Sequence, residues 1–268
     1  MELKPGDLSG LWASADGALV YKEVPKAACS ALAQLVYHAD HGQFFTGDIH
    51  DATEGVTRWP FDPSKIHAGS LIFSAVRNPY ARIVSAYLDK VCTDQRDGKP
   101  YRNTLRQVLA ERYGVDLAGD PVRAFRRFLL FVRDVTLYRE RFWYDRHWTA
   151  QVQHLRALPL NGLAYGHLFQ IEAMEAGLAP ILSRMDPARR PVDLPRFNPS
   201  AKPARPVSDW FDDLSVHLMQ ELYRWDFELL GYDRFDPGQA QPIHALDIPA
   251  SNARMSDPHA PHWARLEI

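Results

Sequence analysis

The sequence contains three units in which an apolar stretch of strand length is followed by a loop and a helical pattern. These stretches, each paired with its helical pattern, are 17–24 with 31–38, 70–76 with 80–88, and 166–171 with 173–184. Pro25 ends the first stretch, because proline cannot donate to a sheet ladder. Strands that alternate with helices are typical of a mainly parallel sheet. The sequence therefore predicts an α/β fold with three layers, in which helices cover a central sheet.

Two further helical patterns complete the expected domain. Asp120 and Pro121 are typical of a helix start, and apolar residues follow them at helical spacing. A last amphipathic helix is predicted from about Phe211 to Leu230, with Gly231 as its stop. Residues 233–268 are rich in Pro, Ala, Asp and His without a period, which predicts an extended or partly disordered tail. We therefore expect a single domain over residues 1–232.

Composition excludes several classes of protein. A formal net charge of −2 excludes nucleic-acid binding through the overall field, although it permits a local basic pocket. The two cysteines form neither a disulfide framework nor a zinc-ligand spacing, so no metal site is predicted. The chain has neither a signal peptide nor an apolar run of about 18 residues, so we expect a cytoplasmic protein without a membrane segment.

The loop after the first predicted strand has the properties of an anion site. A strand end followed by a helix start directs unpaired backbone N–H groups and the positive helix end at one point. Lys26 adds a full charge there, and the small Ala27 and Ala28 allow an anion to approach the backbone. The glycines of a Walker A loop are missing. Taken alone, the loop also fits a plain strand–helix turn with a solvated lysine.

The second predicted strand ends in a similar way. Arg77 follows it at the end where open α/β sheets bind ligands, and Ser85 lies eight residues later in the helical pattern. An arginine grips a phosphate with two parallel hydrogen bonds. The alternative is that Arg77 pairs with a carboxylate and Ser85 fills a helix contact. Two basic loops at neighbouring strand ends predict a ligand with two separated anionic groups.

Both loops resemble binding segments of one enzyme family. Val24-Pro25-Lys26-Ala27-Ala28-Cys29-Ser30 is similar to the loop that binds the 5′-phosphosulfate of 3′-phosphoadenosine 5′-phosphosulfate (PAPS). Residues 76–87, which include Arg77-Asn78-Pro79-Tyr80 and Ser85, resemble the segment that binds its 3′-phosphate. Three more stretches agree, namely 147–151 (with Ala150 where the family usually has Pro), 169–172 and 223–232. From about residue 18 to 232 the chain thus resembles the Golgi-type carbohydrate sulfotransferases and their soluble bacterial relatives, sulfotransferase family 2.

The resemblance implies a P-loop NTPase-like sulfotransferase fold and a function. PAPS would donate a sulfuryl group to a hydroxyl of a carbohydrate or another small acceptor, in line and without a metal. Lys26 would neutralise the charge that grows on the leaving 5′-phosphate. The expected donor-binding residues are Pro25, Lys26, Ala27, Ala28, Cys29, Ser30, Arg77 and Ser85.

The general base is less well defined. An imidazole suits this role at neutral pH, so we favour His50, with Asp48 and His147 as alternatives and Glu54 and His67 further along the chain. A histidine with a purely structural role in a loop is the competing interpretation.

Two other functions stay open, a catalytically silent nucleotide-binding or scaffold protein and a diverged P-loop kinase. The sequence names neither the acceptor nor the oligomeric state.

Overall fold

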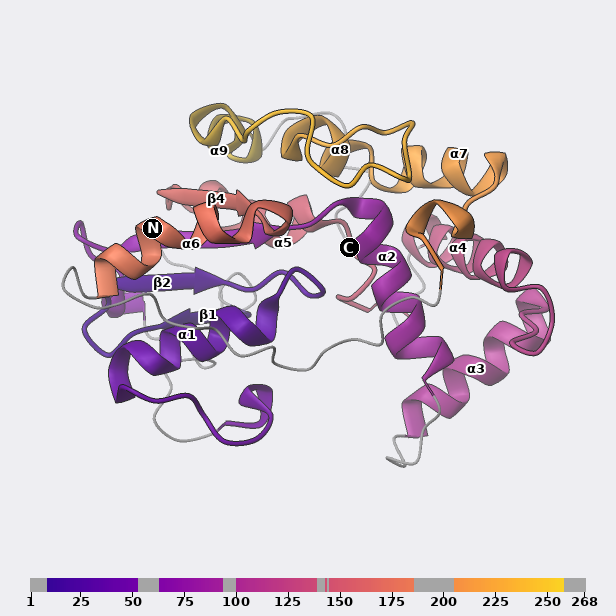
Figure 1. Cartoon of the computed structure of the whole chain (residues 1–268), viewed down its shortest axis with the longest axis horizontal. Helices are drawn as coiled ribbons and strands as arrows, with labels where there is room; N and C mark the ends of the chain where they lie inside the picture. The colour runs from indigo at the N-terminus through magenta and orange to yellow at the C-terminus, as the bar shows by residue number, and fades with distance from the viewer. Residues whose placement is uncertain are drawn as a thin grey trace. The chain divides into compact units, whose positions relative to one another are not determined.

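The computed structural model describes residues 9–52, 63–93, 100–138, 143, 145–185 and 205–257. These residues belong to two compact units, whose helices and strands are labelled in Figure 1. The first unit is drawn from residues 1–77, 151–198 and 245–258, and the second from 78–150, 199–244 and 259–268. The expectation of one domain over residues 1–232 stays a prediction.

A four-stranded sheet forms the centre of the first unit. Its strands are β1 (Leu11–Ala13), β2 (Leu19–Lys22), β3 (Leu71–Val76) and β4 (His167–Gln170), in the order β1-β2-β3-β4. The β2–β3 and β3–β4 pairs are parallel, and β1 is antiparallel to β2. The predicted mainly parallel sheet is therefore confirmed. The short antiparallel strand β1 is an addition that the sequence pattern did not predict.

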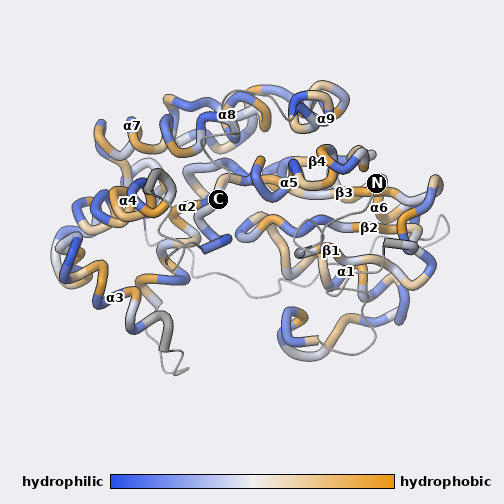
Figure 2. Tube along the Cα trace, turned by 180° about the vertical axis from the view of Figure 1, so that it is seen from behind, coloured by the Kyte–Doolittle hydropathy of each residue, from blue (hydrophilic) through white to orange (hydrophobic). Residues whose placement is uncertain are grey.

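Helices α1 (Cys29–His41) and α6 (Met174–Met185) pack against one face of this sheet. The side chains of Tyr21 and Phe73 contribute to a buried cluster with Leu32 of α1 and Ile181 of α6. The alternate strand residues, such as Ile72, are also buried, so the sheet is covered on both faces. Figure 2 shows the apolar colour that runs along β2 and β3, as expected for strands covered on both sides.

Helix α9 (Ile248–Met255) lies in the segment that was expected to be an extended or partly disordered tail. Asp247 caps it by accepting a hydrogen bond from the backbone N–H of Ala250 at 2.9 Å. Asn252 ties it to the first unit, since its side chain exchanges hydrogen bonds of 3.0 and 2.9 Å with the backbone of Tyr165. The helix also packs on α5 (Gln151–Leu160). Eight residues are too few for a helical period to stand out in the sequence.

The second unit is helical. Its elements are α2 (Pro79–Tyr87), a π-helical turn at Leu88–Cys92, α3 (Pro100–Tyr113), α4 (Pro121–Tyr138), α7 (Asp213–Leu222) and α8 (Arg224–Leu230). The start of α4 at Pro121 and the end of α8 at Gly231, which has a φ of 76°, confirm the predicted boundaries. The single helix expected from Phe211 to Leu230 is wrong, because Tyr223 leaves helical geometry at a φ of −120°.

Aromatic side chains fill the interior of the second unit. Tyr87 packs on Phe125 and Phe128 with ring-centroid distances of 5.2 and 5.1 Å, and Phe128 contacts Trp148 edge to face. Edge-to-face and offset pairs at these distances are favourable beyond the area they bury.

Among the residues that the structure describes, no helix is both long and apolar enough to cross a bilayer.

Candidate functional site

The loop between β2 and α1 has an unusual backbone. Lys26 and Ala28 adopt positive φ angles of 68° and 59°, a region that costs L-residues about 1–2 kcal/mol each. Strain of this kind is concentrated at functional sites in proteins. Ala28 is the N-cap of α1, yet no described side chain caps this helix, and its first turn holds no acidic residue. The first N–H groups of α1 and its positive end therefore suit an anion.

Arg77 lies beside this loop. It follows β3, the parallel neighbour of β2, so both loops lie at the same edge of the sheet. Its Nη1 donates a hydrogen bond of 3.2 Å to the backbone carbonyl of Lys26. The structure thus brings together the two cationic residues that the sequence predicted for the donor site within the first unit.

Gln151 holds the backbone of Arg77 in place. Its fully buried side chain accepts a hydrogen bond from the Arg77 N–H at 2.9 Å and donates one to the Arg77 carbonyl at 2.8 Å. Gln151 was not among the predicted site residues. The signal that could have found it is its position at the end of the family-like stretch 147–151.

His50 is also brought to the start of α1. It lies on a short 3-10 helix, Ile49–Asp51, and its Nε2 lies 3.0 Å from Ser30 Oγ and 3.9 Å from Cys29 Sγ. Asp48, the second candidate base, accepts a hydrogen bond from the His50 N–H at 3.0 Å. This contact gives Asp48 a part in fixing the turn that carries His50.

Two other base candidates have different surroundings. The Nδ1 of His67 accepts a hydrogen bond from the Gly69 N–H at 3.1 Å, and its Nε2 lies 3.1 Å from the Asp16 carbonyl, so both ring nitrogens are engaged. In the second unit, His147 Nδ1 lies 2.5 Å from Asp145 Oδ1. Burial works to raise the pKa of Asp145, but the hydrogen bonds and charge of His147 outweigh it and leave that pKa lowered. Glu54 lies outside the described residues.

Ser85 belongs to the second unit, whereas Arg77 belongs to the first. The side chain of Ser85 is buried in α2, and its Oγ finds no hydrogen-bond partner among the described residues. A buried hydroxyl without a partner carries a desolvation cost that a bound polar ligand would remove. This is the behaviour expected of a ligand-binding hydroxyl.

Comparison with known proteins identifies the family of the chain. A family model described as the sulfotransferase family matches residues 9–233, which cover most of the chain and include both loops. No curated protein and no solved structure matches the chain. The chain therefore belongs to the sulfotransferase family, and this membership supports a sulfotransferase activity.

Proposed function

We propose that the protein transfers a sulfuryl group from PAPS to a hydroxyl group of a carbohydrate or another small acceptor. One observation carries this proposal: the uncapped start of α1, the strained loop with Lys26 and the guanidinium of Arg77 meet at one sheet edge. Such an arrangement holds a small, highly charged anion even in a chain with a net charge of −2.

The loop residues 25–30 bind the 5′-phosphosulfate in this proposal. The backbone N–H groups at the start of α1 and the Lys26 ammonium neutralise the charge that grows on the bridging oxygen as the sulfur–oxygen bond breaks. Arg77 and Ser85, the two residues that the family resemblance gives, hold the 3′-phosphate. The guanidinium beside the loop and the unpartnered hydroxyl in α2 each support this role.

His50 acts as the general base of the proposed reaction. It takes the proton of the acceptor hydroxyl while that oxygen attacks the sulfur of the donor in line, and adenosine 3′,5′-bisphosphate leaves. The position of His50 supports this role, because its Nε2 lies beside the first turn of α1, where the phosphosulfate is proposed to bind. His147 stays the alternative base, since Asp145 orients its ring.

A thermal-shift comparison tests the donor assignment. Adenosine 3′,5′-bisphosphate should raise the melting temperature more than AMP or ATP, because only the bisphosphate offers both anionic groups. An equal response to ATP would contradict the proposal and favour the kinase alternative. Incubation of labelled PAPS with a panel of glycans and small alcohols then identifies the acceptor. Binding of the bisphosphate without transfer to any acceptor would favour a silent nucleotide-binding protein.

A further inference from the structure

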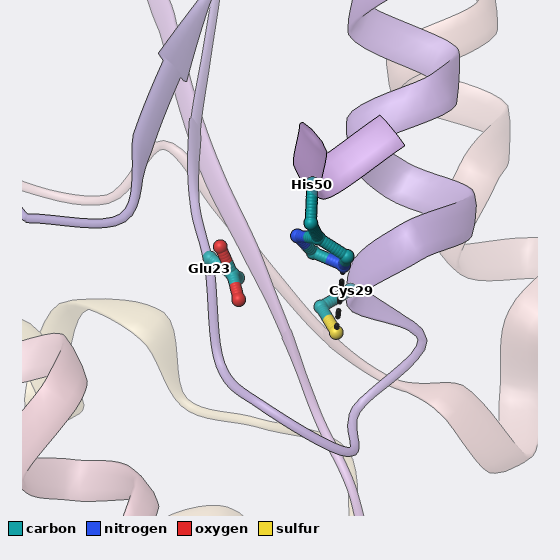
Figure 3. A group of neighbouring side chains, drawn as sticks. All are labelled: Glu23, Cys29 and His50. Atoms are coloured by element: carbon teal, nitrogen blue, oxygen red, sulfur yellow. Dashed lines mark hydrogen bonds between the residues drawn. The ribbon is translucent and has the colours of Figure 1, made fainter. Parts of the chain in front are cut away.

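Glu23, Cys29 and His50 bring a carboxylate, a thiol and an imidazole to one point of the first unit (Figure 3). Glu23 follows β2, Cys29 begins α1, and His50 lies on the 3-10 helix that packs beside them. One ligand atom from each residue lies within 4.8 Å of the other two. We propose that these three side chains bind one Zn²⁺ ion.

The donor set fits this ion. Zinc takes thiolate sulfur at about 2.3 Å and imidazole nitrogen or carboxylate oxygen at about 2.0–2.2 Å, with three protein ligands where a fourth position stays open. Donors around such a tetrahedral ion are about 3.5 Å apart, so side-chain shifts of about 1 Å close the site. Mg²⁺ and Ca²⁺ prefer oxygen ligands alone, which the Cys29–His50 pair does not provide.

Neighbouring groups hold two of the ligands in position. Trp12 donates a hydrogen bond from Nε1 to Glu23 Oε2 at 3.3 Å, and the Glu23 side chain is buried. Asp48 accepts the backbone N–H of His50. Outer contacts of this kind orient metal ligands and contribute to affinity. The spacing 23, 29 and 50 matches no zinc motif, which is why the sequence predicts no metal site.

A bound ion would take the lone pair of His50 and thereby inhibit the transfer reaction. This consequence rests on the proposed function, since it requires His50 to be the base. Binding of the ion does not depend on it. The expectation that sulfuryl transfer itself needs no metal is compatible with such an inhibitory site.

Cobalt titration of the full chain tests the site, because Co²⁺ replaces Zn²⁺ and reports on thiolate ligation through a charge-transfer band. We expect this band to saturate at one ion per chain and to disappear when Zn²⁺ is added. Cys29→Ser should abolish the band. Glu23→Gln should keep it while weakening Co²⁺ affinity at least about tenfold, as a lost ligand should cost no less than a lost outer contact. Cys92→Ser is the matched control and should behave as the unmodified chain.

Three results would overturn the proposal: no cobalt binding, an unchanged band in Cys29→Ser, or loss of the band in Cys92→Ser. Circular dichroism of each variant checks folding, and His50→Gln replaces Glu23→Gln if the latter does not fold. The thermal shift with adenosine 3′,5′-bisphosphate is read separately. Bisphosphate binding without cobalt binding refutes the metal site alone, and the reverse refutes the proposed donor site alone.

Discussion

The loops that follow β2 and β3 each place a basic residue between a strand and a helix, Lys26 and Arg77, but they differ in how they begin that helix. After β2, Ala28 starts α1 with a left-handed backbone and without a side-chain cap. After β3, Asn78 caps α2 by accepting the Tyr80 N–H at 2.9 Å, and Pro79 occupies the first turn. Within the described part of the chain, α1 therefore starts without a side-chain cap, whereas a side chain already occupies an N–H group at the start of α2, so the start of α1 is the better suited to an external anion. The second loop contributes through the side chain of Arg77.

Lys26→Ala tests the charge in the first loop and should have the largest effect. We expect kcat to fall at least about a hundredfold, because a removed donor to the growing charge costs about 10²–10³ in rate. The measurement is transfer of labelled sulfate to the acceptor found in the panel. Lys26→Gly is the control for strain, since glycine tolerates the φ of 68°. It should lose the activity without losing stability, and a Lys26→Ala enzyme with full rate would remove Lys26 from the mechanism.

Gln151→Ala tests whether Arg77 needs its support. The change leaves the Arg77 N–H and carbonyl without the partners they have now, so we expect a loss of roughly 2 kcal/mol in the free energy of unfolding. Bisphosphate affinity should fall as well, because Arg77 loses its fixed position. Urea unfolding and calorimetry measure the two effects. The exposed Gln107, which contacts Glu111, provides a control variant that should change neither.

Ala28→Asp places a carboxylate at the uncapped start of α1. We expect bisphosphate affinity to fall about tenfold, since the carboxylate competes for the same N–H groups and repels the phosphate. Ala28→Gly removes the strain of the left-handed backbone without adding charge, so it should bind normally and be slightly more stable. Calorimetry measures the bisphosphate affinity of both variants. Equal affinity in the aspartate variant would show that the helix start does not contact the ligand.

Asn78→Ala removes the side-chain cap of α2, whereas Ala28→Asp adds one to α1. Loss of an N-cap costs about 1 kcal/mol, so the free energy of unfolding should fall while bisphosphate affinity stays nearly unchanged. Asn78→Asp should keep the cap and restore the stability. If Asn78→Ala instead weakened binding as strongly as Ala28→Asp, the distinction between the two loops would fail.

Asp212 is the N-cap of α7, and unlike the uncharged cap Asn78 it should contribute to stability in a way that depends on pH. Burial works to raise its pKa, but the hydrogen bonds from Ser215 and the charge of Arg126 lower it below 3.8. A lowered folded-state pKa means that the carboxylate stabilises the fold at neutral pH. This contribution is lost as the pH falls below the unfolded value. Asp212→Asn should therefore be less stable than the unmodified chain at pH 7, by about 1 kcal/mol or less. The gap should shrink in acid, and a pH-independent gap in urea unfolding would contradict this.

The sequence predicted what depends on local pattern and missed what depends on distant contacts. Apolar runs and a lysine after Pro25 predicted the parallel strands and the loop at their edge. The break at Tyr223 was missed because the apolar stripe continues through it, and Leu11–Ala13 is too short to show a period. Gln151 reaches Arg77 across 74 residues, and His50 reaches Ser30 across 20. Contacts over such separations are set by packing, which a single sequence does not display.

The left-handed backbone at position 28 has a consequence for chemical synthesis of the protein. A positive φ is unfavourable for an L-residue but is the ordinary conformation of its mirror image. A chain assembled by ligation with D-alanine at position 28 should keep the loop, lose its strain and gain resistance to proteases that cut there. At position 28 of the loop between β2 and α1, a D-residue therefore fits the backbone better than the natural L-alanine does.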